Sequence, residues 1–180
     1  MGIPTLITTN NITSDTSLSA FTSSIDSTYD EYMFVFTDTR ASTNDVHLSF
    51  AVSTDGGTGY GIVKTTTHFQ ANHYEDASGG AVAYQTDMDI AQSAAAGIIA
   101  FGLGNDADQS VAGVFHLFSP SNTTYVTHFY SRFSNYFRLD ASLDHFCAGY
   151  INSAGDVDAI KFYMSSGNIG NSTIQMYGIA

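Results

Sequence analysis

Histidines are the residues of this chain best suited to chemistry, and five of the six lie in segments that read as β-strands. His116, His128 and His145 alternate with aromatic residues, so their imidazoles could reach one face of a sheet. Three converging imidazoles could hold a zinc ion and leave one position open for water. However, the chain has no His-x-His pair, and only Cys147 stands close to His145 as a further ligand. We therefore interpret these histidines as polar or hydrogen-bonded strand residues and expect no metal or cofactor.

Acidic residues and glycines do not form a catalytic motif either. The runs 105–109 and 87–89 resemble fragments of calcium-binding loops, but neither has the Asp-x-Asp-x-Asp-Gly pattern with its distant Glu. The motifs Gly-x-Ser-x-Gly, His-Glu-x-x-His and the phosphate-binding loop are missing. Glutamate occurs only as Glu31 and Glu75, which argues against a glycosidase with paired glutamates. The sequence therefore predicts a protein that is not an enzyme.

The densest group of residues suited to binding is aromatic and lies between positions 125 and 138. Tyr, Phe and Arg are enriched at the centres of protein interfaces, and aromatic rings with Asn or Asp also suit carbohydrates. We predict an interaction surface here, with most of the rings in the core and one corner exposed. Its members are Tyr125, Phe129, Tyr130, Arg132, Phe133, Asn135, Tyr136, Phe137 and Arg138.

The elements that must position these residues are short strands in which apolar and polar residues alternate. Val46, Leu48, Phe50 and Val52 would share one face, and the glycine-rich segment 55–60 would turn the chain back as a hairpin. Strands are expected over 18–22, 32–36, 46–53, 61–69, 98–103, 111–118, 124–132, 143–151, 157–164 and 172–179. The region 71–80 is expected to be a surface loop. One short helix is expected near 86–96, where Thr86 could cap and three alanines favour helix.

About ten strands with short loops predict an all-β fold, an antiparallel β-sandwich of two sheets, with a jelly roll favoured over an immunoglobulin-type domain. Residues 1–16 are expected to form an N-terminal arm or an edge strand, because Pro4 is unsuited to a central strand. Residues 17–180 are expected to form one domain, a common length for such folds.

Charge narrows the classes of partner. Seventeen acidic residues against five basic ones give a formal net charge of −12, which opposes binding to nucleic acid and to anionic membranes. A single cysteine, Cys147, cannot form an intramolecular disulfide. The first residues show no signal-peptide pattern, and no apolar run reaches the length of a membrane span. We therefore expect synthesis and folding in the cytoplasm of the host cell.

Several segments resemble virion proteins that tailed phages of marine bacteria encode. They are Ile25–Tyr32 (IDSTYDEY), Leu48–Gly57 (LSFAVSTDGG), Gly113–Ser121 (GVFHLFSPS), Asp158–Ile169 (DAIKFYMSSGNI) and Ile174–Ile179 (IQMYGI). The resemblance covers most of the chain after residue 20 and consists of strands and turns. It implies a head decoration or tail component of the particle, without any catalytic or binding residue. An acidic surface also suits seawater, because salt screens its self-repulsion.

We therefore expect a non-enzymatic structural protein located on the exterior of the virion. A capsid decoration or cement subunit is the preferred role, since 180 residues leave no room for the long shaft of a tail fibre. The alternative is a tail-associated, receptor-binding module that recognises a glycan on the host surface. Expected partners are other virion proteins of the capsid or tail, with further copies of this chain and the host glycan as additional candidates.

Overall fold

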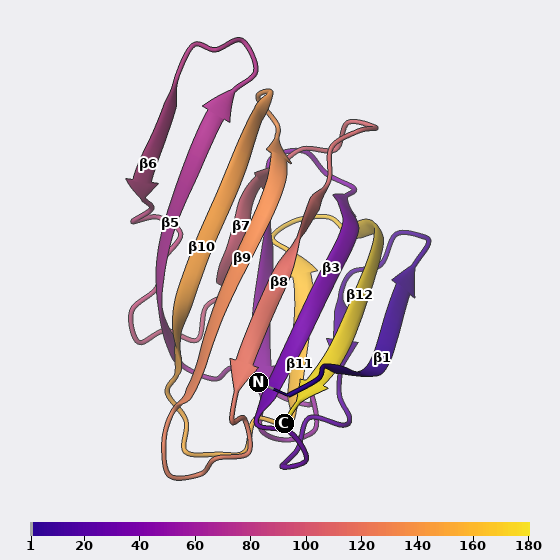
Figure 1. The fold of residues 1–180 in the computed structure, drawn as a ribbon, viewed down its shortest axis with the longest axis vertical. Coiled ribbons are helices and arrows are strands. Elements are labelled where there is room, and N and C mark those ends of the chain that lie inside the picture. The colour runs from indigo at the N-terminus through magenta and orange to yellow at the C-terminus, as the bar shows by residue number, and fades with distance from the viewer. Residues whose placement is uncertain (1) are drawn as a thin grey trace.

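The computed structural model describes residues 2–180, and these form twelve β-strands and no helix (Figure 1). The strands are β1 (Thr5–Ile12), β2 (Ser19–Phe21), β3 (Glu31–Ala41), β4 (Val46–Ser53), β5 (Lys64–Tyr74), β6 (Gly80–Tyr84), β7 (Gly97–Leu103), β8 (Val111–Phe118), β9 (Thr127–Phe137), β10 (Ala141–Ile151), β11 (Ala159–Met164) and β12 (Ile169–Ile179). All pairings between these strands are antiparallel. The predicted all-β antiparallel fold is confirmed.

The twelve strands form one sheet, which folds over so that two groups of strands face each other. A front layer runs in the order β1-β12-β3-β8-β9-β10-β5-β6, and a back layer runs β2-β11-β4-β7. Figure 1 shows β7 and β11 behind the strands of the front layer. The layers are joined at one residue pair, Leu103 of β7 with Phe137 of β9. Strand β1 lies at one edge of the front layer, paired only with β12, and β6 lies at the other edge.

Aromatic side chains fill the space between the layers. Phe162 of β11 lies 4.8 Å from the ring of Phe36 on β3, and Phe50 of β4 lies 4.8 Å from both Phe115 and Phe129. None of these strand pairs shares backbone hydrogen bonds, so the contacts cross from one layer to the other. All five rings are at most 2% exposed. Burial of this apolar area is the main source of stability for such a fold.

The helix expected near 86–96 is wrong. This segment forms turns against the edge of β5, where Ser93 and Lys64 exchange two backbone hydrogen bonds of 2.9 and 3.1 Å. Thr66 N donates a third bond, of 2.8 Å, to Ile90 O. Bonds to a neighbouring strand have replaced the bonds that a helix would make within itself. The alanine run favours helix locally, but the segment has no apolar stripe to bury against the sheet.

The hairpin expected between 46–53 and 61–69 is also wrong. Strand β4 pairs with β7 and β11, whereas β5 pairs with β10 and β6, so the connection crosses from the back layer to the front layer. Alternation identifies a strand but does not say which strand lies beside it. The loop expected over 71–80 is a hairpin instead, because β5 continues to Tyr74 and β6 begins at Gly80.

Candidate interaction surface

Strand β9 divides the predicted aromatic cluster between two faces. Phe129, Phe133 and Asn135 point inward and are at most 3% exposed, as the period-two alternation of a strand requires. Tyr130 and Arg132 point outward, and Tyr130 is 44% exposed. The three inward residues belong to the interior and cannot touch a partner, so the structure does not bring the cluster together as one surface.

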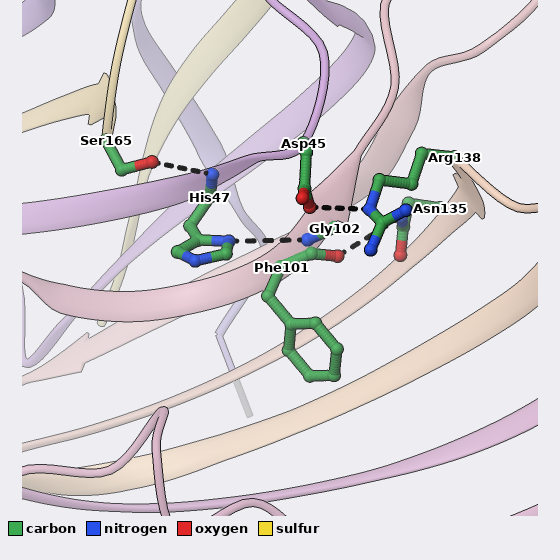
Figure 2. Close-up of polar contacts among 7 residues, drawn as sticks. All are labelled: Asp45, His47, Phe101, Gly102, Asn135, Arg138 and Ser165. Carbon is green, nitrogen blue, oxygen red and sulfur yellow. Dashed lines mark hydrogen bonds and ion pairs between the residues drawn. The ribbon is translucent and has the colours of Figure 1, made fainter.

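The other four predicted residues lie towards the ends of β9. Tyr125 is 71% exposed in the loop before the strand. Tyr136 and Phe137 are partly buried at the far end of β9, and Tyr136 comes 11 residues after Tyr125 in the sequence. Arg138 follows them and binds the carboxylate of Asp45 at 2.6 Å, a contact that Figure 2 shows. Of these four, only Tyr125 presents a largely free ring.

The outward-facing side of the front layer, here called the outer face, carries a row of aromatic side chains. The strand register aligns Arg132, Phe146, Phe69 and Tyr84 across β9, β10, β5 and β6. The rings of Phe69 and Phe146 stack at 4.7 Å, and the Arg132 guanidinium lies 4.9 Å from the Phe146 ring. Arg132 also donates to both carboxylate oxygens of Asp144, at 2.6 to 3.2 Å.

A second aromatic group lies beside this row on β8 and β9. The ring of Tyr130 is 4.5 Å from His116 and 5.5 Å from Phe118. His116 Nδ1 contacts the carboxylate of Glu31 on β3. On this part of the outer face Arg132 is paired with Asp144, and Glu31 has His116 as a polar neighbour, so the charged groups have polar partners beside the aromatic area. Such a composition is typical of the centre of a protein interface.

A hollow of about 700 Å³ opens at one end of the outer face, next to Phe118. Tyr125 and His128 line it together with Asn122 and Thr124. Asn122 Oδ1 accepts the backbone N–H groups of Thr124 and Tyr125 at 2.8 and 2.9 Å, which holds the loop in place. The hollow therefore combines aromatic rings with polar groups on an ordered loop.

The strand histidines do not converge. His116 and His128 lie on the outer face, but His145 points inward and is fully buried. Among residues 2–180, no three His, Cys, Asp or Glu side chains are arranged to hold a metal ion. Cys147, two residues after His145, is a buried thiol whose pKa is raised to about 12 by burial, so it is a poor nucleophile near neutral pH.

The interior contains a chain of polar contacts that sequence reasoning missed. His145 Nε2 donates to Asn135 Oδ1 at 2.6 Å, and His145 Nδ1 lies 3.2 Å from His68 Nε2. His68 Nδ1 lies 3.3 Å from Ile98 O, and Asn135 Nδ2 donates to Phe101 O at 3.5 Å (Figure 2). Burial lowers the pKa of His68 to about 4 and that of His145 to about 3, so both are neutral near pH 7. Only the pairing register of β5, β10 and β9 could have revealed this network.

Comparisons with protein-family models, with curated proteins and with solved structures found no match. In the described part of the chain, no helix is long and apolar enough to cross a membrane. The grounds for a function are therefore the side chains of this protein and their arrangement in the fold.

Proposed function

We propose that this protein is a non-enzymatic structural subunit of a tailed-phage particle, bound to the capsid as a decoration or cement protein. The observation that carries the proposal is the outer face. It presents the exposed rings of Phe69 and Tyr130 with the half-buried ring of Phe146, and its charged groups have polar partners within the chain. A partner can bury this area without burying a charged group that lacks a polar partner, which would be a large penalty at an interface.

A jelly roll fits this role, and the strand order supports it. Without β5, β6, β9 and β10, four strands ordered β1-β12-β3-β8 face four ordered β2-β11-β4-β7. In the first group β1 pairs with β12 and β3 follows, and in the second group β2 pairs with β11 and β4 follows. One long antiparallel ribbon that wraps into two sheets gives this order of early and late strands. The four additional strands then extend the front layer beyond β8 and carry Phe69, Phe146 and Tyr130.

The mechanism is mass action. A protein that binds the assembled shell, but not free capsid subunits, stabilises the shell by the free energy of binding. Aromatic anchors supply affinity for the partner, and the bidentate Arg132–Asp144 pair within this chain holds the Arg132 side chain in place beside them. No bond is made or broken, so the role requires no catalytic residue.

The test is to locate this protein in purified particles of its phage by cryo-electron microscopy. Many copies in the lattice of the shell are expected, with the outer face against the capsid. Phe146→Ser should lower the occupancy, whereas the control Leu139→Ser should not, because Leu139 is 53% exposed in the turn between β9 and β10. Copies confined to the tail, or absence from particles, would overturn the decoration role.

The hollow beside Phe118 favours a second candidate, a tail-associated module that binds a host-surface glycan. Tyr125 offers a ring on which a sugar could stack, and His128 and Thr124 offer hydrogen-bonding groups beside it. Nuclear magnetic resonance titration with a panel of oligosaccharides tests this candidate. Shifts confined to the hollow and abolished by Tyr125→Ala would support it, and a panel without any shift would exclude it.

A further inference from the structure

Strand β6 is the outermost strand of the front layer, and one side of its backbone has no partner among residues 2–180. Gln85 N donates to His68 O at 2.8 Å, so the backbone groups of Gln85, and of Ala83 and Ala81 in alternation, point towards β5. Because N–H and C=O groups of alternate residues point to opposite sides of a strand, those of Gly80, Val82 and Tyr84 point away from β5. No hydrogen bond joins these groups to any described residue.

The opposite edge of the same layer is protected, and β6 is not. Strand β1 follows Pro4 and has a register shift between Leu6 and Thr8. The side chain of Asn10 also donates to Ser19 Oγ and Ala20 O of β2. Proline, bulges and covering contacts are the devices by which natural edge strands avoid pairing with another chain.

Strand β6 has none of these devices. Its sequence, GAVAY, contains no charge and no proline, and its register with β5 is unbroken. Val82 is 76% exposed and Tyr84 is 53% exposed. A regular, apolar and open edge of this kind is a template for a further strand.

We infer that β6 pairs with β6 of a second copy of this chain, antiparallel about a two-fold axis at Val82. The occupant is a second copy because the strand is complementary to itself in this register. Val82 meets Val82 of the second copy, and the bulky ring of Tyr84 lies opposite Gly80, which has no side chain. Each copy then donates three hydrogen bonds and accepts three, from Gly80, Val82 and Tyr84. The two front layers become one continuous sheet.

Charge at the ends of β6 sets how this dimer responds to salt. Glu75 and Asp76 precede the strand, and Asp87 and Asp89 follow it. Antiparallel pairing brings the acidic turn of one copy beside the acidic segment of the other, so their repulsion opposes association. Salt screens that repulsion. The paired strand has five residues, which gives an interface below the standard size and a weak dimer that salt strengthens.

Cysteine cross-linking tests the register directly. In a hydrogen-bonded antiparallel pair the two Cα atoms lie about 5.5 Å apart, which a disulfide can bridge. Val82→Cys should therefore form a covalent dimer under mild oxidation, at least about 10-fold faster than Ala81→Cys. Ala81 is the matched control, since it is also exposed but faces Ala83 of the second copy in this register. The native Cys147 is buried and does not interfere.

Sedimentation velocity tests the dimer of the unmodified protein at about 50 mM and about 500 mM NaCl. The dimer fraction should rise with protein concentration and with salt. Val82→Pro removes an outward donor without removing a bond to β5, and Val82→Lys adds a charge at the axis, so both variants should stay monomeric. Circular dichroism verifies that they fold. A wild-type monomer at both salt concentrations, equal cross-linking of the two cysteine variants, or a dimer unchanged by Val82→Lys would overturn the inference.

Discussion

The space between the two layers has two regions that are built differently. The aromatic core, between β3, β8, β4 and β11, consists of Phe34, Phe36, Phe50, Phe115 and Phe162, all at most 2% exposed. The polar interior, on the inward side of β5, β9 and β10, contains Lys64, His68, Gln70, Thr127, Ser131, Asn135 and His145, all at most 9% exposed. The first region buries area without a polar atom, whereas the second buries many.

Hydrogen bonding shows what this difference means. In the polar interior, Lys64 Nζ, Gln70 Oε1, Thr127 Oγ1 and Ser131 Oγ have no hydrogen-bond partner among the described residues. The neutral rings of His68 and His145 carry one N–H group each, whereas their contacts with Ile98 O, with each other and with Asn135 Oδ1 need three donated hydrogens. One of these three contacts is therefore not a hydrogen bond. A buried polar group without a partner destabilises a fold. We conclude that the aromatic core supplies most of the stability, and that the polar interior makes it depend on pH.

The largest effect is expected from Phe162→Ala. This ring packs against Phe36, Phe34 and Phe115 at centroid distances of 4.8 to 5.7 Å. Its removal leaves a cavity that rigid neighbours cannot fill, and should lower the free energy of unfolding by about 3–5 kcal/mol. Urea unfolding measures the loss. Phe146→Ala on the outer face is the matched control and should cost less than half as much, and equal losses would contradict the central role of the core.

The second largest effect is expected from acid. Because the pKa values of His68 and His145 are lowered to about 4 and about 3, the unfolded chain binds more protons than the folded one below pH 6.5. Stability should be complete above pH 6.5 and fall by about 1 kcal/mol or more per pH unit towards pH 4.5. Urea unfolding at several pH values measures the slope.

The variants of the two histidines separate this effect from ordinary acid denaturation. His68→Leu combined with His145→Leu should flatten the slope between pH 6.5 and 4.5, although it lowers stability at pH 7 by leaving Asn135 Oδ1 without a donor. The hydrogen-bonded carboxylates of Asp26 and Asp55 have lowered pKa values, so their losses begin below this window. A slope unchanged in the double variant would assign the acid sensitivity elsewhere.

Lys64→Met is expected to stabilise the protein. Lys64 is fully buried and has no hydrogen-bond partner in the described part of the chain. Its ammonium lies 5.8 Å from the ring of Phe50, and burial lowers its pKa to about 8. Methionine keeps the length without the charge, so stability at pH 7 should rise by about 1–2 kcal/mol.

The pH dependence of stability in the wild type and in the Lys64→Met variant gives an independent measurement. Above pH 8 the folded wild type releases its proton while the unfolded chain keeps one, so the stability of the wild type should rise towards pH 9.5. The Lys64→Met variant lacks this rise, and the gap between the two proteins should narrow. A gap that stays constant across this range would show that the charge of Lys64 does not cause the difference.

The aromatic core could be predicted from sequence because period-two alternation over 46–53 and 111–118 marks which residues point inward. The same rule separates Phe129 and Phe133 from Tyr130 and Arg132, so grouping them as one surface disregarded the alternation. Alternation needs no knowledge of strand partners, which explains its success over most strands. The helix near 86–96 failed where hydrogen bonds to β5 outweighed local propensity.

The polar interior could not be predicted, because its contacts join residues far apart in the sequence. His68 and His145 meet only because β5 pairs with β10 in a register that places Cys147 opposite His68. A single sequence contains no sign of that register. The outer face has the same origin, since Phe69 and Phe146 come from these two strands. Sequence reasoning therefore identifies single strands, but it misses the surfaces that several strands build together.

The smallest expected effect compares two buried hydroxyl groups. Ser172 Oγ and Thr39 Oγ1 share a buried hydrogen bond of 2.6 Å, whereas Ser131 Oγ in the polar interior has no partner within residues 2–180. Ser172→Ala leaves Thr39 unpaired and should cost about 1–2 kcal/mol. Ser131→Ala removes only an unsatisfied group, so it should be neutral or stabilise by less than about 1 kcal/mol. Both substitutions delete one oxygen from a residue 3% exposed, which makes them a matched pair for urea unfolding. If Ser131→Ala costs as much as Ser172→Ala, the hydroxyl of Ser131 contributes a contact in solution, and the polar interior stabilises the fold more than its geometry indicates.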